Sequence, residues 1–503
     1  MDLTGTPLSL ADLATISRAE AEVRIGRAAQ PKIHAAHQVV ERITASDAVV
    51  YGVNTGFGKL SEVHIARGDL GQLQLNLVRS HACGVGVPLS EPEVRAMMVL
   101  RANVLALGCS GIRLEVLELL TEMLNRGVHP MIPEKGSVGA SGDLAPLAHL
   151  SLVLVGEGEA FYQGERLPGG AALQRAGLQP VSLAAKEGLA LLNGTQAMHA
   201  VGGLALFRAK RLSRVADVFG AMSLEALKGT PVAFDPRIHA ARPHPGQQAC
   251  AAHLLWLLRG SEIRASHLQG DPRVQDAYSL RCMPQVHGAV RGALAHGEEV
   301  LAIESGSATD NPLVFSEEGE VLSGGNFHGA PLALAFDYAA IAVTDLMSIA
   351  ERRIDRLINS DTSEGLPPFL TSNAGMQSGF MIPHVAAVAL LNEAKVLAHP
   401  ASIDNLPTSA GKEDHVSMGM TSALKLRTIV SNAESLFAIE LLAAAVALEF
   451  RRPLKAGRGV EQAYAKLRAL VPPFTDDRPM YREIEQVAEA IRAGEFDSEM
   501  EPR

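Results

Sequence analysis

The chain has few residues of the kinds that mark several common protein classes. Of its 503 residues one is tryptophan, 4% are aromatic and four are cysteine. So low an aromatic content favours an Ala/Leu-rich helical interior over a β-sandwich. The cysteines are too few and too scattered for a disulfide framework, and none is spaced as a zinc-ligand pair: they are Cys83, Cys109, Cys250 and Cys282. We expect reduced thiols and no metal site.

The chain also lacks an excess of positive charge, since its net charge is −10 at pH 7. Nucleic acids and anionic membranes bind basic surfaces, so neither is expected as a partner. The segment from Met1 to Pro7 has no basic region and no apolar stretch typical of a signal peptide. The longest apolar run, 436–450, contains Glu440 and Glu449 and is too short to span a bilayer. A soluble, cytoplasmic protein is expected.

No linker rich in Ser, Gly or Pro and no repeat of fixed period interrupts the chain. At 47% hydrophobic residues it can bury a large core, so we expect domains that are joined through shared helices. Apolar periodicity predicts long helices over about 187–220, 330–358 and 416–452, which suggests a central bundle. Short alternating runs around a glycine predict hairpins at 161–167 and 314–321. The predicted fold class is mainly α, a long-helix bundle with minor β-hairpins.

Two shorter helices have clear end signals. Ser90, Pro92 and Glu93 form a capping-box pattern, and the apolar period that follows ends before Gly108. Ser110 is the expected cap of a second helix over 112–126, which Gly127 closes.

The most informative segment runs from Gly136 to Leu150, because its Ala140-Ser141-Gly142 core can cyclise into an electrophile. If the Gly142 nitrogen attacks the Ala140 carbonyl carbon and Ser141 then loses its hydroxyl as water, the product is an imidazolone with an exocyclic methylene. Glycine suits the step, since it has no Cβ and permits a tight turn. A bare Ala-Ser-Gly is usually a loop or a helix cap, so the triplet alone proves little.

The whole run Gly-Ser-Val-Gly-Ala-Ser-Gly-Asp-Leu-Ala-Pro-Leu-Ala-His-Leu resembles the signature of the aromatic amino acid ammonia-lyases. This resemblance implies a 4-methylidene-imidazol-5-one formed from Ala140, Ser141 and Gly142, no dissociable cofactor, and a role for Asp143 in cyclisation. It implies a long-helix fold of the ammonia-lyase/aspartase-like type that assembles as a homotetramer, with active sites built from several chains. We expect an N-terminal domain over 1–190 with the Tyr51 loop and the electrophile, and a bundle domain over 191–503.

Tyr51 is the expected general base, in the glycine-rich loop Tyr-Gly-Val-Asn-Thr-Gly-Phe-Gly that is similar to the family's active-site loop. Tyrosine has a reference pKa of about 10, so nearby positive potential must lower it. The alternative is a tyrosine that only anchors the loop. A phosphate-binding loop is excluded, since Val53 and Leu60 stand where that motif needs a glycine and a hydroxyl.

Further motifs follow in the family's order. The resemblance implies that Asn193 positions the electrophile and the amine, that Arg281 clamps the substrate carboxylate through its forked guanidinium, and that His81 contacts the substrate ring. Gln275 and Tyr278 are placed in the site and Phe327 beside the electrophile, whereas Asp310-Asn311-Pro312 is expected to be scaffolding. Each has a plainer structural alternative, namely a hydrogen-bonding histidine, an Asn-Gly turn or a core phenylalanine.

Glu413 lies in Glu-Asp-His-Val-Ser-Met, which is similar to the histidine-specific branch of the family. A carboxylate can accept the N–H of an imidazole, whereas a phenyl ring would leave its charge without a partner. Gly411 and Lys412 depart from the small polar pair expected before it, and Met283 from a frequent glutamine. Asp414 and His415 could instead be metal ligands, but adjacent helical residues point about 100° apart and no second cluster completes a site.

The resemblance therefore implies that the chain eliminates ammonia from L-histidine to give trans-urocanate. The alternatives are a phenylalanine or tyrosine ammonia-lyase or a 2,3-aminomutase of the same family, and a non-catalytic structural relative. His81 and Glu413 argue against the first group, and the intact triplet and Tyr51 argue against the second.

Overall fold

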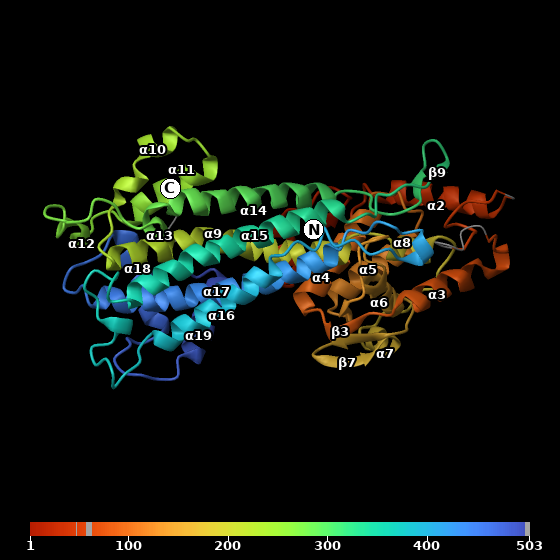
Figure 1. The fold of residues 1–503 in the computed structure, drawn as a ribbon. Helices are drawn as coiled ribbons and strands as arrows, with labels where there is room; N and C mark the ends of the chain where they lie inside the picture. The colour runs from red at the N-terminus through yellow and green to blue at the C-terminus, as the bar shows by residue number, and fades with distance from the viewer. Residues whose placement is uncertain (47, 57–62, 498–503) are drawn as a thin grey trace. The chain divides into compact units, whose positions relative to one another are not determined.

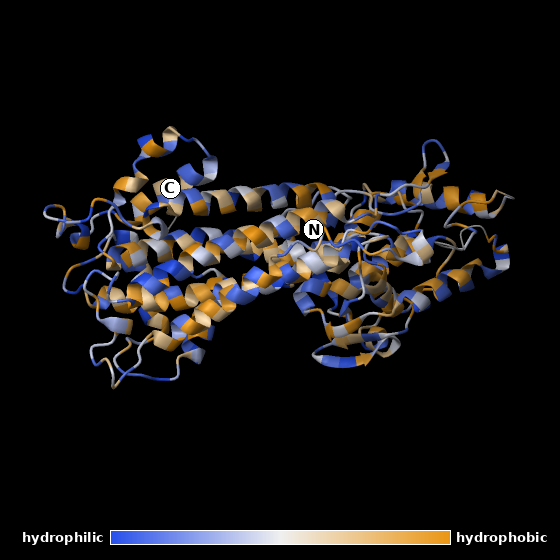
Figure 2. Ribbon diagram, viewed as in Figure 1, coloured by the Kyte–Doolittle hydropathy of each residue, from blue (hydrophilic) through white to orange (hydrophobic). Residues whose placement is uncertain are grey.

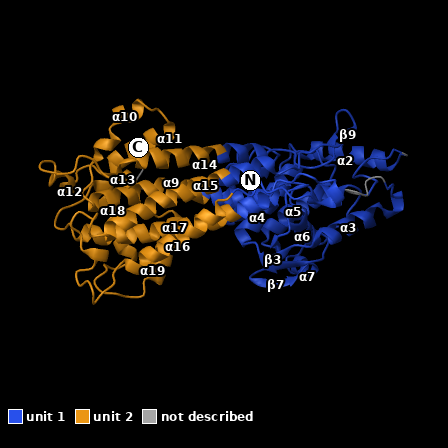
Figure 3. Ribbon diagram, viewed as in Figure 1, with its two compact units in different colours: residues 1–207, 297–337, 400–424 blue, residues 208–296, 338–399, 425–503 orange. Residues whose placement is uncertain are grey.

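The computed structural model describes residues 1–46, 48–56 and 63–497. The chain forms two compact units, each made of three segments (Figure 3). Unit 1 comprises residues 1–207, 297–337 and 400–424, and unit 2 comprises 208–296, 338–399 and 425–503. Helices dominate both units and the strands are short (Figure 1), which confirms the mainly α prediction.

Four long helices pass from one unit's residues to the other's: α9 (Gln196–Ala226), α14 (Met283–Ser305), α15 (Ala330–Ile358) and α17 (Gly419–Glu449). This agrees with the expectation that shared helices join the domains. The boundary predicted between residues 190 and 191 stays a prediction, because compactness alone does not show where an independently folding domain ends.

Unit 1 contains most of the shorter helices and all of the strands that the structure describes. Its helices are α1 (Leu10–Ser17), α2 (Gln30–Thr44), η2 (Arg67–Asp69), α3 (Leu70–His81), α4 (Glu91–Leu105), α5 (Leu114–Asn125), α6 (Leu144–Leu154), α7 (Gly169–Arg175), α8 (Glu187–Leu192) and η5 (Ser409–Gly411). Its strands are β1 (Asp2–Leu3), β2 (Arg24–Ile25), β3 (Val85–Pro88), β4 (His129–Pro130), β5 (Pro133–Lys135), β6 (Glu159–Tyr162), β7 (Glu165–Pro168), β8 (Leu313–Phe315) and β9 (Glu320–Leu322).

Within the described ranges the strands form four small sheets and no extended one. Strands β1 and β2 pair in parallel, and β3 and β5 pair antiparallel. Strands β4, β6 and β7 form an antiparallel sheet in which Tyr162 faces Glu165, and β8 pairs with β9 so that Phe315 faces Glu320. Both predicted hairpins are therefore present.

The predicted start of α4 is confirmed, whereas that of α5 is wrong. Glu93 accepts the backbone N–H of Ser90 at 2.8 Å, as a capping box requires. Ser110 does not cap α5, because the helix begins only at Leu114. Arg113 stands at the N-cap position without a side-chain cap, and its own N–H donates to Glu187 Oε1 at 3.0 Å. Gly127 closes α5 in the left-handed conformation, as predicted (φ +73°).

The stretch predicted as one helix over 187–220 is two helices. A turn at Asn193-Gly194 separates α8 from α9, and Gly194 has φ +150°. The Asn-Gly turn thus overrides the apolar period on either side of it. The other two long helices occur as predicted, with α15 over 330–358 and α17 over 419–449.

Unit 2 is a bundle in which parts of the four long helices lie beside α16 (Met381–Leu397), and apolar residues recur along each helix (Figure 2). Phe219 of α9 packs against Phe437 of α17, with ring centres 6.1 Å apart. Arg353 pairs with Glu440 at 2.5 Å, and both side chains are fully buried. The remaining elements are η3 (Pro231–Phe234), α10 (Pro236–Ala240), α11 (Pro245–Leu257), α12 (Glu262–Ala265), α13 (Tyr278–Arg281), η4 (Pro368–Leu370), α18 (Arg458–Leu470) and α19 (Tyr481–Ala493).

Helices α15 and α17 are long and apolar enough to cross a membrane by length and composition alone. Their most apolar windows are 72% and 83% buried within the protein, which is how core helices behave.

Candidate active site

The loop that carries Ala140, Ser141 and Gly142 is held in a tight, largely buried conformation before α6. Gly142 has φ +74°, and a Cβ added to it would lie 2.2 Å from the carbonyl oxygen of Gly194. The Asp143 N–H donates to that same oxygen at 2.7 Å. Only glycine fits this left-handed position against another backbone. The loop therefore rests directly on the turn between α8 and α9.

Asp143 is fully buried behind the loop. Its Oδ1 accepts the Ser137 hydroxyl at 2.7 Å, and its Oδ2 accepts the Met198 N–H at 2.7 Å. Burial raises the pKa of this carboxyl to about 6, against the lowering effect of these hydrogen bonds. A carboxyl group with such a pKa can take and return a proton near neutral pH.

A cavity of about 870 Å³ opens in front of the loop within unit 1. Six residues proposed from the sequence line it together: Tyr51, His81, Ser141, Asn193, Phe327 and Glu413. They come from six separate stretches of chain, so the fold brings together what the motifs only suggested. Phe57 and Gly58 of the predicted Tyr51 loop, and Leu60, lie outside the described residues.

The Glu413 carboxylate reaches the serine of the triplet. Its Oε1 accepts the Ser141 hydroxyl at 3.2 Å, and its Oε2 accepts the Thr408 hydroxyl at 2.6 Å. Residues 409–411 all have left-handed φ values and turn the chain before Glu413. Asp414 and His415 follow in this loop and not on a helix, which corrects the geometry assumed for them from the sequence.

His81 stands at the end of α3 with one ring nitrogen already engaged. Its Nδ1 lies 2.8 Å from the carbonyl oxygen of Leu77 and 3.0 Å from the Ser80 hydroxyl. Because a carbonyl only accepts, Nδ1 carries the proton in the neutral ring. The Nε2 of that tautomer is an acceptor, so His81 and Glu413 offer the cavity two acceptors for ring N–H groups.

Asn193 follows α8 at the turn that supports the loop. Its Nδ2 donates to the carbonyl oxygen of Asn311 at 2.9 Å. Its Oδ1 is buried and has no hydrogen-bond partner among the described residues. A buried amide oxygen without a partner is costly, so it suits a donor that arrives with a ligand, such as an amine.

Gln275, Tyr278 and Arg281 belong to unit 2, and none of them is among the described residues that line this cavity. Tyr278 is 71% exposed, and the Arg281 guanidinium lies over its ring at 4.6 Å. The Arg281 Nε is buried without a partner among the described residues. The structure of unit 2 thus presents a short polar segment with unsatisfied hydrogen-bonding capacity.

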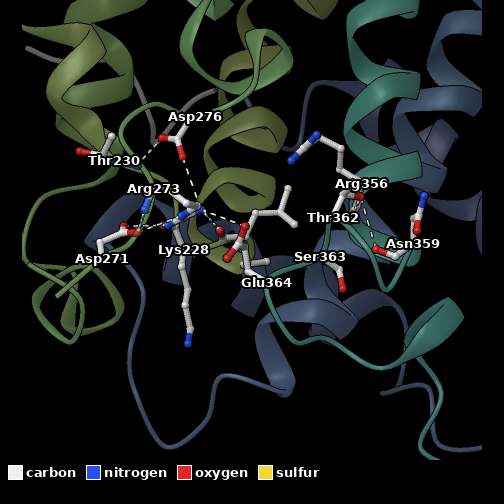
Figure 4. A network of polar contacts seen from close by, with 12 residues as sticks. Lys228, Thr230, Asp271, Arg273, Asp276, Arg356, Asn359, Thr362, Ser363 and Glu364 are labelled. Atoms are coloured by element: carbon white, nitrogen blue, oxygen red, sulfur yellow. Dashed lines mark hydrogen bonds and ion pairs between the residues drawn. The ribbon is translucent and has the colours of Figure 1, made fainter.

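Figure 4 shows the network that anchors this segment. Arg273 donates to the carbonyl oxygens of Leu227, at 3.1 Å, and Lys228, and pairs with Asp271 at 2.9 Å. Asp276 accepts the Thr230 N–H at 2.7 Å. Arg273 and Asp276 face inward, whereas Gln275 and Tyr278 between and after them are exposed.

Sequence reasoning missed several residues of the site. Asn311, expected to be scaffolding, lines the cavity and orients Asn193, whereas its neighbour Asp310 pairs with the buried Lys186. The Ser137 contact with Asp143 could have been suspected from their place in one motif. The Arg273 network joins residues that no local pattern relates.

Comparison with known proteins identifies the family of the chain. The model of the aromatic amino acid lyase family matches residues 8–469. A histidine ammonia-lyase of Myxococcus xanthus is 55% identical over 494 residues, which cover 98% of this chain and 97% of the relative.

Solved structures give the same result. The crystal structure of histidine ammonia-lyase from Trypanosoma cruzi matches with a TM-score of 0.91 at 43% identity, covering 98% of this chain and 94% of that one. A tyrosine aminomutase from Streptomyces globisporus matches with a TM-score of 0.94 at 37% identity, covering 99% of both chains. From the extent of these matches, the chain belongs to the aromatic amino acid lyase family.

Proposed function

We propose that this protein is a histidine ammonia-lyase, which eliminates ammonia from L-histidine to give trans-urocanate. The observation that carries the proposal is the pair of ring-directed acceptors, Glu413 and His81, in the cavity that Ser141 also lines. An imidazole can donate an N–H to such a group, whereas a phenyl ring leaves both unsatisfied. The names of the Myxococcus and Trypanosoma relatives support the same substrate.

We further propose that Ala140, Ser141 and Gly142 cyclise into 4-methylidene-imidazol-5-one and that no dissociable cofactor is used. The Gly142 nitrogen bonds to the Ala140 carbonyl carbon, whose oxygen leaves as one water; the Ser141 hydroxyl and α-proton leave as a second. The left-handed Gly142 supports this step, and so does the raised pKa of the adjacent Asp143, because such a carboxyl group can exchange a proton near neutral pH. The finished group supplies an electrophile that draws electrons from the substrate.

The chain's own residues then have separate tasks in the proposed reaction. Tyr51 takes the β-proton as general base, and the unpartnered Asn193 Oδ1 accepts a hydrogen bond from the amine. Phe327 packs beside the electrophile and helps to exclude water. Arg281 holds the carboxylate by a two-pronged contact, with Gln275 and Tyr278 beside it.

We infer that the active form is a homotetramer in which a neighbouring subunit supplies Gln275, Tyr278 and Arg281. Tyr278 is exposed, and the Arg281 Nε has no hydrogen-bond partner among the described residues. Both observations support a role for this segment in the active site of a neighbouring subunit. We also propose that the enzyme acts in the cytoplasm without a nucleic-acid or membrane partner, which the net charge of −10 supports.

The test is direct. The purified protein is incubated with histidine, phenylalanine or tyrosine, and the absorbance of urocanate, cinnamate or coumarate is followed. We expect urocanate from histidine to dominate. Faster formation of cinnamate or coumarate, or a β-amino acid as the main product, would identify another member of the family, and no turnover at all would indicate a non-catalytic relative.

A further inference from the structure

Arg101 is a fully buried cation on α4. Its Nη1 donates to Gln196 Oε1 at 2.6 Å and its Nη2 to the carbonyl oxygen of Ala190. Its Nε is buried with no hydrogen-bond partner, and the guanidinium forms no ion pair with any described residue. Burial lowers its pKa to about 10, so it remains charged at neutral pH.

A second buried cation lies nearby but is paired. Lys186 Nζ contacts Asp310 Oδ2 at 2.7 Å, and both side chains are fully buried. Asp310 also interacts electrostatically with Arg101. We call Arg101, Lys186 and Asp310 the buried triad; two cations and one carboxylate give it a net charge of +1. A proton passing between Lys186 and Asp310 leaves this sum unchanged.

The buried triad lies directly behind the wall of the cavity. A Cβ added to Gly194 would lie 2.3 Å from Arg101 Nη1, while the Gly194 carbonyl oxygen accepts the Asp143 N–H on the side of the electrophilic loop. Asp310 precedes Asn311, which lines the cavity. One layer of backbone thus separates the charge from the site.

We propose that the buried triad makes the potential in the cavity more positive and thereby favours the Tyr51 phenolate and the bound carboxylate of the substrate. The inference rests on the proposed function. An unpaired buried cation costs stability, and a protein that keeps one has another use for it. Because Arg101 is fully buried, solvent screens its charge less than it screens a surface charge, and the charge acts beyond contact distance.

Other charged groups also act on the cavity and form the constant background for this effect. Those that line it are the titratable His81 and the charged Lys412 and Glu413; those behind it are the buried Asp143 and Glu187 and the half-buried Glu304. Glu187 is paired with Arg113 at 2.7 Å, whereas Arg101 has no such partner. Arg101 is therefore the group whose charge can be cancelled with the least disturbance.

Gln196→Glu cancels the charge without removing Arg101. The new carboxylate stands where Gln196 Oε1 already contacts Arg101, and the Thr309 hydroxyl, which now accepts from Gln196 Nε2 at 2.9 Å, can rotate to donate instead. Arg101→Met removes the charge by a second route, and Arg101→Lys keeps it. Arg95→Met is the matched control, because Arg95 is also buried on α4 and also binds carbonyl oxygens, those of Ile16 and Leu124.

The measurements are the pH profile of kcat/KM for histidine and the thermal midpoint of unfolding. A phenolate base makes kcat/KM rise with pH, and losing positive potential raises the pKa of the phenol, so the rising limb should move to higher pH. We expect Gln196→Glu and Arg101→Met to move it by roughly half a unit to one unit, a three- to tenfold loss at fixed pH on the limb. Gln196→Glu should also raise the thermal midpoint, since it pairs the cation.

Arg101→Lys should leave the limb near the wild-type position, and Arg95→Met should not move it. The proposal is overturned if Gln196→Glu folds with a midpoint at or above wild type and leaves the limb in place, or if Arg95→Met moves it as far. If wild-type protein makes no urocanate, the proposed function fails by itself. The thermal midpoint of Gln196→Glu then still shows whether Arg101 gains stability from a carboxylate partner.

Discussion

Replacing Glu413 by glutamine tests the substrate assignment most directly. Thr408 donates to Glu413 Oε2 at 2.6 Å, so the amide oxygen of the new side chain will keep that position. The amide nitrogen then replaces Oε1, which faces Ser141 at 3.2 Å, and it cannot accept an imidazole N–H. A lost hydrogen bond to a charged group is worth about 1.5–3 kcal/mol, or roughly ten- to a hundredfold in kcat/KM for histidine.

The assay compares kcat/KM for histidine with any residual turnover of phenylalanine or tyrosine. Only kcat/KM for histidine should fall by that factor. The rings of phenylalanine and tyrosine have no N–H group, so they do not depend on an acceptor at this position. Asp414→Asn is the matched control, since it removes the neighbouring carboxylate, which is exposed and does not line the cavity. The reasoning fails if Glu413→Gln lowers all substrates equally, because Glu413 would then serve the scaffold.

Four further predictions follow from the same structure. The intact wild-type chain should be lighter than its sequence mass by two waters, and Ser141→Ala should fold but lose nearly all activity; an unmodified mass in active protein would refute cyclisation. Arg281→Lys should weaken turnover of histidine markedly, and an equal loss with histidinamide, which lacks the carboxylate, would show that the assigned role is wrong. Light scattering should show a tetramer under assay conditions, and a fully active monomer would contradict the shared site. Burial raises the pKa of Glu225 from 4.5 to about 7, so its protonated form is favoured in the folded protein. The free energy of unfolding should therefore fall as pH rises from about 4.5 to about 7, and Glu225→Gln should flatten that slope in urea titrations, whereas an unchanged slope would contradict the burial effect.

The sequence predicted the features that local chemistry controls. The capping box at Ser90, the left-handed Gly127, both hairpins and the span of α15 depend on neighbours within a few residues, and all occur as expected. The cap predicted for α5 was wrong: the helix begins after Arg113, whose N–H is held by Glu187, far along the chain. Periodicity alone also missed the turn between α8 and α9.

The candidate site shows the same limit. Motifs identified Tyr51, His81, Asn193, Phe327 and Glu413, and the fold brings them around one cavity. No motif could reveal the Arg101 charge, because its contacts, such as Gln196 Oε1, come from other helices. Residue type suggests the chemistry of a side chain, but its electrostatic surroundings depend on tertiary packing.

Under the proposed cyclisation, the hydrogen bond from the Asp143 N–H to the Gly194 carbonyl oxygen links ring closure to folding. In the folded chain the left-handed turn of the triplet rests on the Asn193-Gly194 backbone, and a nascent or misfolded chain lacks that support for ring closure. Under the proposed cyclisation, the loss of two waters then becomes a permanent record that a given molecule has once reached the native state. Mass spectrometry after full denaturation would then give the fraction of molecules in a preparation that carry the modification, and hence the fraction that has folded at least once.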